Sequence, residues 1–252
     1  MKCFYHTDMD GKCAGAIVYW HYKQNIHFRE LEPTDMIPIN YKDDFPFDII
    51  KPDEDVVIVD FSLQKEGEFE RLLKITDRIT WIDHHKTAIE KHRNMQHLRG
   101  LRKDDEAGCV LTWKFYNSDK SIPRIVELLG DYDIWAFKFG EDTNKLQAGI
   151  RLYGNGMPPE CSLWEDYFKG IAIDVLIRDG ETALKYRDSY YQSLIKGWSF
   201  YVEFEGYKAI CCNAGSVSSQ LFDSVKEDYD LMIPFIFDGK QWTVSLYTKK
   251  KH

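Results

Sequence analysis

Short apolar runs that stop abruptly at polar residues mark the N-terminal part of the chain. The runs at 2–5, 56–59 and 79–82 are rich in β-branched and aromatic side chains and lack the polar alternation of a half-exposed strand. Amphipathic segments at 14–24 and 66–76 lie between them and are long enough for crossover helices. This alternation predicts an α/β fold with a doubly wound, mainly parallel sheet.

The pattern becomes helical beyond residue 107. We expect helices at 108–116 and 122–129, followed by a loop that contains Asp131 and Asp133. A break rich in glycine and proline precedes a charged amphipathic helix over residues 179–197. The remainder predicts a small α/β domain, with strands at 200–204, 207–211, 231–237 and 242–247 and a helix at 217–225.

These elements predict three parts of the chain. A large α/β domain would span residues 1–178, a linker helix 179–197, and a smaller C-terminal α/β domain 198–252. A chain of 252 residues can bury roughly three quarters of its unfolded surface. It therefore needs neither disulfides nor a structural metal in order to fold.

The charge and the cysteines of the chain indicate which substrates and which cellular environment it suits. The formal net charge of −8 argues against a protein that grips long duplexes, but it permits a short anionic substrate held through metal ions. The six cysteines show no CxxC pair and no zinc spacing, which indicates reduced thiols in a cytoplasmic protein. Because no apolar stretch approaches about 18 residues and no signal-peptide pattern occurs, we expect no membrane association.

Polar side chains follow each of the three N-terminal strands, in the order His6, Asp8 and Asp10, then Asp60, then Asp83, His84 and His85. Ligands of open parallel sheets bind beyond the carboxyl ends of the strands. Imidazole and carboxylate suit manganese and related divalent ions. Crowded carboxylates also repel one another unless a cation neutralises them. The sequence therefore predicts a divalent-metal site at this edge of the sheet.

Each of these motifs has an ordinary structural alternative. An aspartate after a strand is most often a turn residue or a helix cap, so Asp60 alone says little. The pattern from His6 to Gly11 is also compatible with a calcium-like or phosphate-binding turn. The three polar residues at 83–85 are less ordinary, because they give up packing directly after a buried strand. The occurrence of all three motifs at strand ends favours the metal site.

The segments HTDMDG, VVIVDFS, WIDHH and DYDIW resemble, in that order, the four motifs of the DHH phosphoesterase family. That family includes the RecJ exonucleases, the oligoribonucleases called nanoRNases, cyclic-dinucleotide phosphodiesterases and family II pyrophosphatases. The resemblance covers roughly residues 1–135, and the tail is similar to the DHH-associated substrate-binding domain. It implies a metal-dependent hydrolase of phosphodiester bonds.

The resemblance also implies two Mn²⁺ ions, with Mg²⁺ or Co²⁺ as alternatives, and a set of ligands. One ion would be held by His6, Asp8 and Asp60, and the other by Asp10, Asp60, His84 and Asp133. Asp133 is preferred because the family pattern places a tryptophan two residues after the ligand, here Trp135, but Asp131 remains an alternative.

Asp83 and His85 have other implied roles. Asp83 would orient a ligand histidine, and His85 would contact the scissile phosphate. Two divalent ions roughly 3.5–4 Å apart would lower the pKa of a bridging water, and the resulting hydroxide would attack phosphorus in line with the leaving oxygen.

The C-terminal part lacks the GGGH-type glycine loop that is typical of RecJ-like and nanoRNase tails. Residues 213–219 stand in its place, and their small side chains could offer amides and hydroxyls to a phosphate at the start of a helix. A plain helix cap at Ser216 is an equal alternative. Arg187 and the basic residues at 249–251 are weaker candidates for contacts with a substrate phosphate. The candidate substrate contacts are Asn213, Gly215, Ser216, Ser218 and Arg151.

The sequence favours a manganese-dependent exonuclease for short RNA or DNA oligonucleotides, similar to the NrnB-like oligoribonucleases. A phosphodiesterase or phosphatase for a small nucleotide, such as a cyclic dinucleotide or a 3′,5′-bisphosphate, is the alternative enzyme. A non-catalytic DHH scaffold that binds nucleic acid is disfavoured, because every expected ligand position holds His or Asp. A homodimer is compatible with the sequence.

Overall fold

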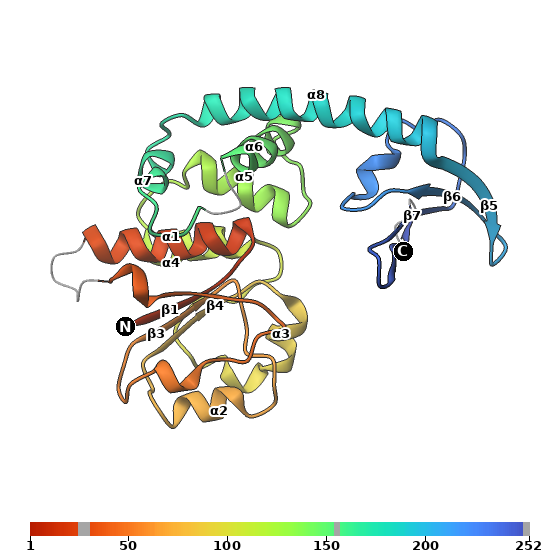
Figure 1. Ribbon diagram of the computed structural model, residues 1–252. Coiled ribbons are helices and arrows are strands. Elements are labelled where there is room, and N and C mark those ends of the chain that lie inside the picture. The colour runs from red at the N-terminus through yellow and green to blue at the C-terminus, as the bar shows by residue number, and fades with distance from the viewer. Residues whose placement is uncertain (25–30, 154–156, 249–252) are drawn as a thin grey trace. The chain divides into compact units, whose positions relative to one another are not determined.

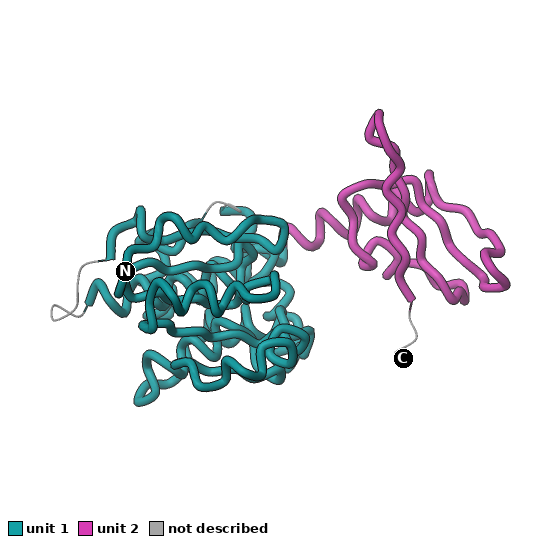
Figure 2. Tube along the Cα trace, turned by 90° about the horizontal axis from the view of Figure 1, so that it is seen from below, with its two compact units in different colours: residues 1–181 teal, residues 182–252 magenta. Residues whose placement is uncertain are grey.

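The computed structural model describes residues 1–24, 31–153 and 157–248. It divides the chain into two compact units, Met1–Glu181 and Thr182–His252 (Figure 2). In the described residues, no helix is both long enough and apolar enough to cross a membrane. The assignment of catalysis to one part and substrate binding to the other remains a prediction.

Unit 1 is built on a four-stranded parallel sheet. Its strands are β1 (Lys2–His6), β2 (Met36–Ile39), β3 (Val56–Val59) and β4 (Ile79–Ile82), in the spatial order β2-β1-β3-β4. Three of them confirm the predicted strands. The sequence reading missed β2, whose Pro38 is tolerated because an edge strand leaves one side of its backbone unpaired.

Helices cover both faces of this sheet (Figure 1). On one face, α1 (Met9–Gln24) and α4 (Gly108–Tyr116) pack over a core that includes Val57 and Val59. On the other face, α2 (Glu68–Leu73) packs over Phe4, Ile58 and Trp81. Because successive residues of a strand point to opposite faces, a strand buried on both sides is apolar throughout. The doubly wound α/β fold is confirmed.

The helices that follow complete unit 1. They are α3 (Lys86–Lys91), α5 (Arg124–Asp133), α6 (Glu141–Leu152) and α7 (Leu163–Phe168), with 3₁₀ turns η1 (Pro33–Asp35), η2 (Phe47–Ile49) and η3 (Arg93–Met95). The predicted loop around Asp131 and Asp133 is wrong, since both residues lie in the last turn of α5. The helix continues there because the Asp131 side chain is buried and accepts hydrogen bonds from the chain that folds back after it.

The long helix α8 (Ile173–Trp198) begins earlier than the predicted residue 179. Its first turns pack into unit 1 through Ile173 and Leu176, which are buried. Two glycines allow α6 and α8 to approach closely: a Cβ on Gly180 would lie 1.7 Å from the carbonyl oxygen of Lys145, and a Cβ on Gly149 would lie 1.9 Å from that of Leu176. The sequence did not predict this start, because it depends on the contact between Gly149 and Gly180, which belong to different helices.

Unit 2 is a mixed sheet with one helical face. Its strands are β5 (Ser199–Phe204), β6 (Tyr207–Asn213), β7 (Leu231–Phe237), β8 (Trp242–Val244) and β9 (Tyr247–Thr248). The order is β5-β6-β7-β8, with β6 and β7 parallel and β9 paired to β7. The predicted turn at Glu205 and Gly206 is confirmed, with φ of 51° and 78°.

Two predictions in unit 2 are wrong. The helix expected at 217–225 is the single 3₁₀ turn η4 (Ser219–Phe222), because Leu221 and Phe222 are already buried and the residues after them are mostly polar. The strand expected at 242–247 is split into β8 and β9, which pair with different parts of β7.

Candidate metal centre

The predicted ligand side chains converge at the carboxyl ends of β1, β3 and β4 and at the end of α5. Their nitrogen and oxygen atoms form three groups, and within each group the atoms lie within 4.8 Å of one another. The groups are His6, Asp8 and Asp60; Asp10, His84 and Asp133; and Asp60, His84 and His85. All six ligand positions expected from the sequence are therefore present in the cluster, and Asp60 belongs to two of the groups.

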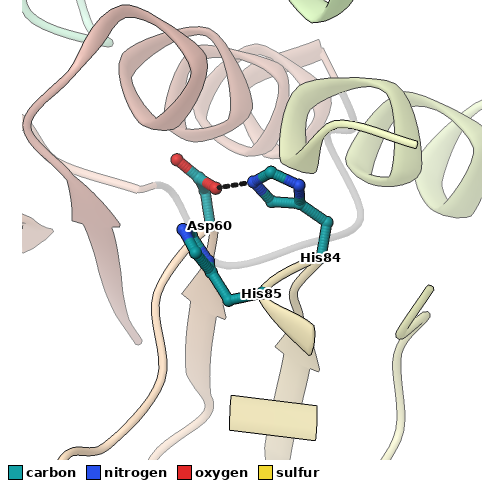
Figure 3. Close-up of side chains that lie close together, drawn as sticks. All are labelled: Asp60, His84 and His85. Carbon is teal, nitrogen blue, oxygen red and sulfur yellow. Dashed lines mark ion pairs between the residues drawn. The ribbon is translucent and has the colours of Figure 1, made fainter. Parts of the chain in front are cut away.

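Asp60 lies in the middle of the cluster. Its Oδ1 is 3.2 Å from Nε2 of His84, the pair drawn in Figure 3, and its Oδ2 is 3.8 Å from Nδ1 of His6. The residue is only 1% exposed, and neither carboxylate oxygen has a hydrogen-bond partner among the described residues. Its φ of 52° places the backbone in the left-handed region, which aspartate tolerates better than most residues.

The environment of Asp60 opposes a negative charge. Burial raises the pKa of this carboxyl well above its usual range, and the neighbouring charges of Asp10 and Asp8 raise it further. A buried carboxylate without hydrogen bonds costs several kcal/mol. A divalent cation placed between the oxygens removes that cost. The unpartnered buried oxygens are thus the feature of the structure that fits a metal ion best.

His6 and Asp8 form the second arm of the cluster. Nδ1 of His6 lies 2.7 Å from Oδ2 of Asp8, while Oδ1 of Asp8 accepts a 2.9 Å hydrogen bond from the Gly11 amide. Burial raises the pKa of Asp8, but these hydrogen bonds outweigh it and leave the pKa below its usual value. A side chain at Gly11 would place its Cβ 2.2 Å from the His6 carbonyl oxygen, so this turn requires glycine.

Asp10, His84 and Asp133 form the third arm. Nε2 of His84 lies 3.3 Å from Oδ2 of Asp133. Burial, followed by the charges of Asp10 and Asp8, raises the pKa of Asp133 to about 8. Burial also raises the pKa of Asp10, whose Oδ2 has no hydrogen-bond partner among the described residues. Together with Asp60, these are three neighbouring carboxyls that resist ionisation, and such a cluster again fits a cation.

The N-terminus of α4 supports this arm. The Cys109 amide donates a 3.1 Å hydrogen bond to Oδ1 of Asp10. A Cβ on Gly108 would lie 2.7 Å from Oδ1 of Asp60 and 2.8 Å from Oδ2 of Asp10. Only glycine lets the helix end approach both carboxylates, whose charge the free amides of that end favour.

Asp83 orients the adjacent histidine pair. The side chain is fully buried, and its Oδ1 lies 2.7 Å from Nδ1 of His85 and accepts a 2.8 Å hydrogen bond from the His84 amide. Burial lowers the pKa of His85, but the contact with Asp83 outweighs it and raises the pKa above its usual value. The ring that Asp83 touches is thus that of His85, whereas it reaches His84 through the backbone.

Tyr41 is a site residue that the sequence reading missed. Its hydroxyl lies 2.9 Å from Nε2 of His85, its ring stacks on Phe61 at 5.4 Å, and the ring of His6 is 4.9 Å away. The side chain remains 41% exposed. Tyr41 follows β2, the strand that the sequence did not reveal, and no motif marks it.

The choice between Asp131 and Asp133 can be judged by geometry. Asp131 accepts hydrogen bonds from the amides of Lys138 and Phe139, at 2.9 and 3.3 Å, and from the Thr143 hydroxyl at 2.5 Å. Burial raises its pKa, but these hydrogen bonds outweigh it and lower the pKa. With its oxygens engaged away from the cluster, Asp131 has a structural role, and the geometry favours Asp133 as the ligand.

One known protein family matches about half of this chain. The profile of the DHH family, N-terminal domain, matches residues 3–130. The chain belongs to the DHH family. The match ends before Asp133, so the inclusion of that residue in the centre rests on the distances given above.

One relative of this DHH-family chain is distant in sequence. The chain is 24% identical over 260 residues to the uncharacterized protein R106 of Acanthamoeba polyphaga mimivirus. The alignment covers 98% of this chain and 59% of R106. The chain therefore spans little more than half of that relative.

Two solved structures are similar to this chain. One is the pGpG-specific phosphodiesterase PggH from Vibrio cholerae, with 12% identity, a TM-score of 0.50 and coverage of 98% of this chain and 81% of that one. The other is an uncharacterized protein from Helicobacter pylori G27, with 16% identity, a TM-score of 0.49 and coverage of 98% and 85%.

Three aromatic side chains flank Asp133 in the sequence of this DHH-family chain. The rings of Tyr132, Trp135 and Phe137 pack edge to face, with Trp135 5.2 Å from Tyr132 and 4.8 Å from Phe137. Trp135 is 57% exposed, and its φ of 58° lies in the left-handed region. The guanidinium of Arg151, a predicted substrate contact, lies 5.9 Å from the centre of the Tyr132 ring.

Two of the predicted substrate contacts of unit 2, Gly215 and Ser218, have local structural roles. Gly215 packs against β7, where a Cβ would lie 2.6 Å from Ile236. Ser218, and not Ser216, caps η4 by accepting a hydrogen bond from the Gln220 amide. Arg187 bonds Gln220 and Asp188, whereas residues 249–251 lie outside the described part of the chain. Asn213 ends β6 with an exposed side chain. The phosphate-binding role of this segment remains a prediction.

Proposed function

We propose that this chain is a metal-dependent phosphodiesterase that hydrolyses small nucleotides of the dinucleotide and short-oligonucleotide class. The observation that carries the proposal is the convergence of two imidazoles and four carboxylates, several of whose buried oxygens lack any hydrogen-bond partner among the described residues. Membership of the DHH family supports a phosphoesterase.

The donor set indicates the kind of ion. His6, Asp8 and Asp60 would hold one ion, and Asp10, His84 and Asp133, together with Asp60, would hold the other. Sites of mixed nitrogen and carboxylate oxygen suit Mn²⁺ and related divalent ions, while the absence of thiolate from the cluster argues against a structural zinc site. Mn²⁺ is the ion that we propose, with Mg²⁺ and Co²⁺ as competitors.

The protein's own groups supply the remaining chemistry. When bound, two divalent ions provide an activated water and offset the charge of the phosphoryl group. His85 lies next to the cluster and would hydrogen-bond a phosphoryl oxygen as charge develops on it. Asp83 fixes the ring from one side and Tyr41 contacts it from the other, so the donor is held in place before the substrate arrives.

Three observations support a small nucleotide as the substrate. The net charge of −8 disfavours long duplexes. Trp135 offers an exposed ring close in sequence to Asp133, and base–aromatic stacking contributes about 1–3 kcal/mol per base. The structural neighbour PggH is a phosphodiesterase specific for the dinucleotide pGpG.

The test is turnover of a substrate panel by chelator-stripped protein to which Mn²⁺ is added back. The panel contains pGpG, RNA and DNA from dimers to decamers, a cyclic dinucleotide and a 3′,5′-bisphosphate. We expect cleavage of linear dinucleotides and short oligonucleotides, with rates that fall as the chain lengthens. Turnover of the bisphosphate alone would make the enzyme a phosphatase. No turnover of any compound would favour a non-catalytic DHH scaffold that binds nucleic acid.

A further inference from the structure

One face of the sheet in unit 2 is apolar and uncovered. The other face is packed by α8 and η4, through a core that contains Ile210, Cys212 and Met232. The uncovered face has Ala209, Cys211 and Ile233 at its centre. Around this centre stand six exposed side chains, which define the open sheet face: Phe200, Phe204, Tyr207, Phe237, Trp242 and Val244.

These side chains form one continuous surface across four strands. Cross-strand pairing places Phe204 beside Tyr207 and Phe237 beside Trp242. The ring of Phe235 connects the two edges, at 6.1 Å from both Phe200 and Trp242. Trp242 is 63% exposed and Val244 57%. No segment in the described part of unit 2 covers this surface.

The composition of the face selects the kind of partner. No strand position on this side carries a charged side chain. A surface for nucleic acid would need Lys or Arg to neutralise phosphates. The core of a protein interface, in contrast, is depleted in charge and enriched in Phe, Tyr and Trp. The face therefore fits an apolar protein surface.

A second copy of this face meets the requirements of such a partner. Five aromatic side chains of about 150–250 Å² each, about half exposed, offer on the order of 500 Å² per copy. Two copies would bury about 1,000 Å², which is the lower bound for a specific interface and fits a dimer that dissociates on dilution. Two sheets pack face to face at about 10 Å, and a two-fold axis makes the same patch complementary to itself.

We propose that this protein is a homodimer in which the open sheet faces of two copies pack together. The inference is independent of the proposed chemistry, because none of these residues belongs to the metal centre. An exposed apolar patch of this extent, on the order of 500 Å², is comparable to the largest patch on a typical monomer, and such patches are often functional.

The test is the mass of the full chain in solution, measured by sedimentation velocity over a series of concentrations. We expect a dimer that dissociates on dilution. Trp242→Glu should be monomeric, because it places a charge within the apolar surface that the partner copy would bury. Tyr186→Glu, which changes an equally bulky and 77% exposed ring on α8, should leave the dimer intact.

Controls keep the outcome clear. If Trp242→Glu loses its circular-dichroism spectrum, Val244→Glu at the sheet edge replaces it. In the wild type, the amides of β7 and β8 should exchange more slowly as concentration rises. A wild type that is monomeric at every concentration would overturn the proposal, as would a folded Trp242→Glu that remains dimeric.

Discussion

At the scale of single residues, the last turn of α5 shows how two aspartates in one motif acquire different roles. The carboxylate of Asp131 accepts three hydrogen bonds from the segment 138–143, and its pKa is lowered. The carboxyl of Asp133 has no such partners and faces His84 and Asp10, which gives it a raised pKa. One side chain stabilises the fold, and the other is costly until a cation binds.

Asp131→Asn should therefore lower the free energy of unfolding by about 1–3 kcal/mol, because an amide cannot accept all three hydrogen bonds. Since the folded pKa of Asp131 is depressed, its contribution is complete above its unfolded pKa of about 3.9 and is lost as pH falls through the folded pKa. Urea unfolding at neutral and acid pH should show the difference from wild type shrinking in acid. Asp133→Asn is the matched control and should keep its stability but lose turnover.

Tyr41 is a second residue whose role follows from its contacts. Tyr41→Phe keeps the stacking on Phe61 and removes only the hydroxyl that touches His85. The loss of one hydrogen bond should lower kcat by about two- to tenfold while KM changes little. Steady-state kinetics on a dinucleotide would check this. A fall in kcat/KM that comes from KM alone would instead make Tyr41 a substrate-binding residue.

At the scale of elements, the approach of α4 to the carboxylates is the most demanding feature. Gly108→Ala would place a methyl group 2.7 Å from Asp60 and force the helix or the ligands to move. We expect a loss of about 1–3 kcal/mol in stability and of most activity. The control is Gly197→Ala in α8, where a Cβ would meet nothing within 4 Å. This substitution should raise the free energy of unfolding by about 0.5–1 kcal/mol, because alanine favours the helix over glycine. Equal behaviour of the two variants would contradict the close-approach argument.

The segment after α5 makes a separate prediction about the substrate. Trp135→Ala should raise KM for a dinucleotide by about five- to a hundredfold, because stacking contributes about 1–3 kcal/mol per base. Hydrolysis of a small diester without a base should not change. Tyr186→Ala, on an exposed ring of α8, is the control. An unchanged KM in Trp135→Ala would remove this ring from the substrate site.

The sequence could predict the elements wherever burial gives them a clear period. The strands at 56–59, 79–82 and 231–237 and the helix at 108–116 coincide with β3, β4, β7 and α4. It could not predict β2, because Pro38 interrupts the strand pattern and only its edge position makes the proline acceptable. The early start of α8 also lay beyond reach, since it depends on a glycine contact between distant segments.

The candidate site follows the same rule. Ligands at strand ends could be predicted, because parallel strands bring their carboxyl ends to one edge. The role of Asp131 could not, since its hydrogen bonds come from a turn formed by tertiary packing. Gly108 and Tyr41 could not be predicted for a similar reason. Each matters through a contact with a residue that is distant in the sequence, Asp60 for Gly108 and His85 for Tyr41.

At the scale of the whole molecule, the side chains that would bind the metal ions lower the stability of the metal-free protein. A cluster of buried, unpartnered carboxylates weakens the metal-free fold, and the ions that relieve this repulsion also provide the chemistry. Asp60 and His84 each belong to two of the three ligand groups, but only Asp60 is a buried carboxyl with two unpartnered oxygens among the described residues, so both effects depend most on Asp60. Asparagine is the informative substitution, because it also tolerates the φ of 52° at this position.

The most direct measurement compares Asp60→Asn with wild type in Mn²⁺-dependent hydrolysis of pGpG, together with the melting temperature of both metal-free proteins. We predict that wild type is inactive after chelation and recovers with Mn²⁺, whereas the variant loses turnover by more than about a hundredfold. Its metal-free melting temperature should equal or exceed that of wild type. Turnover by wild type without any divalent ion, or an Asp60→Asn variant that remains active, would contradict the account.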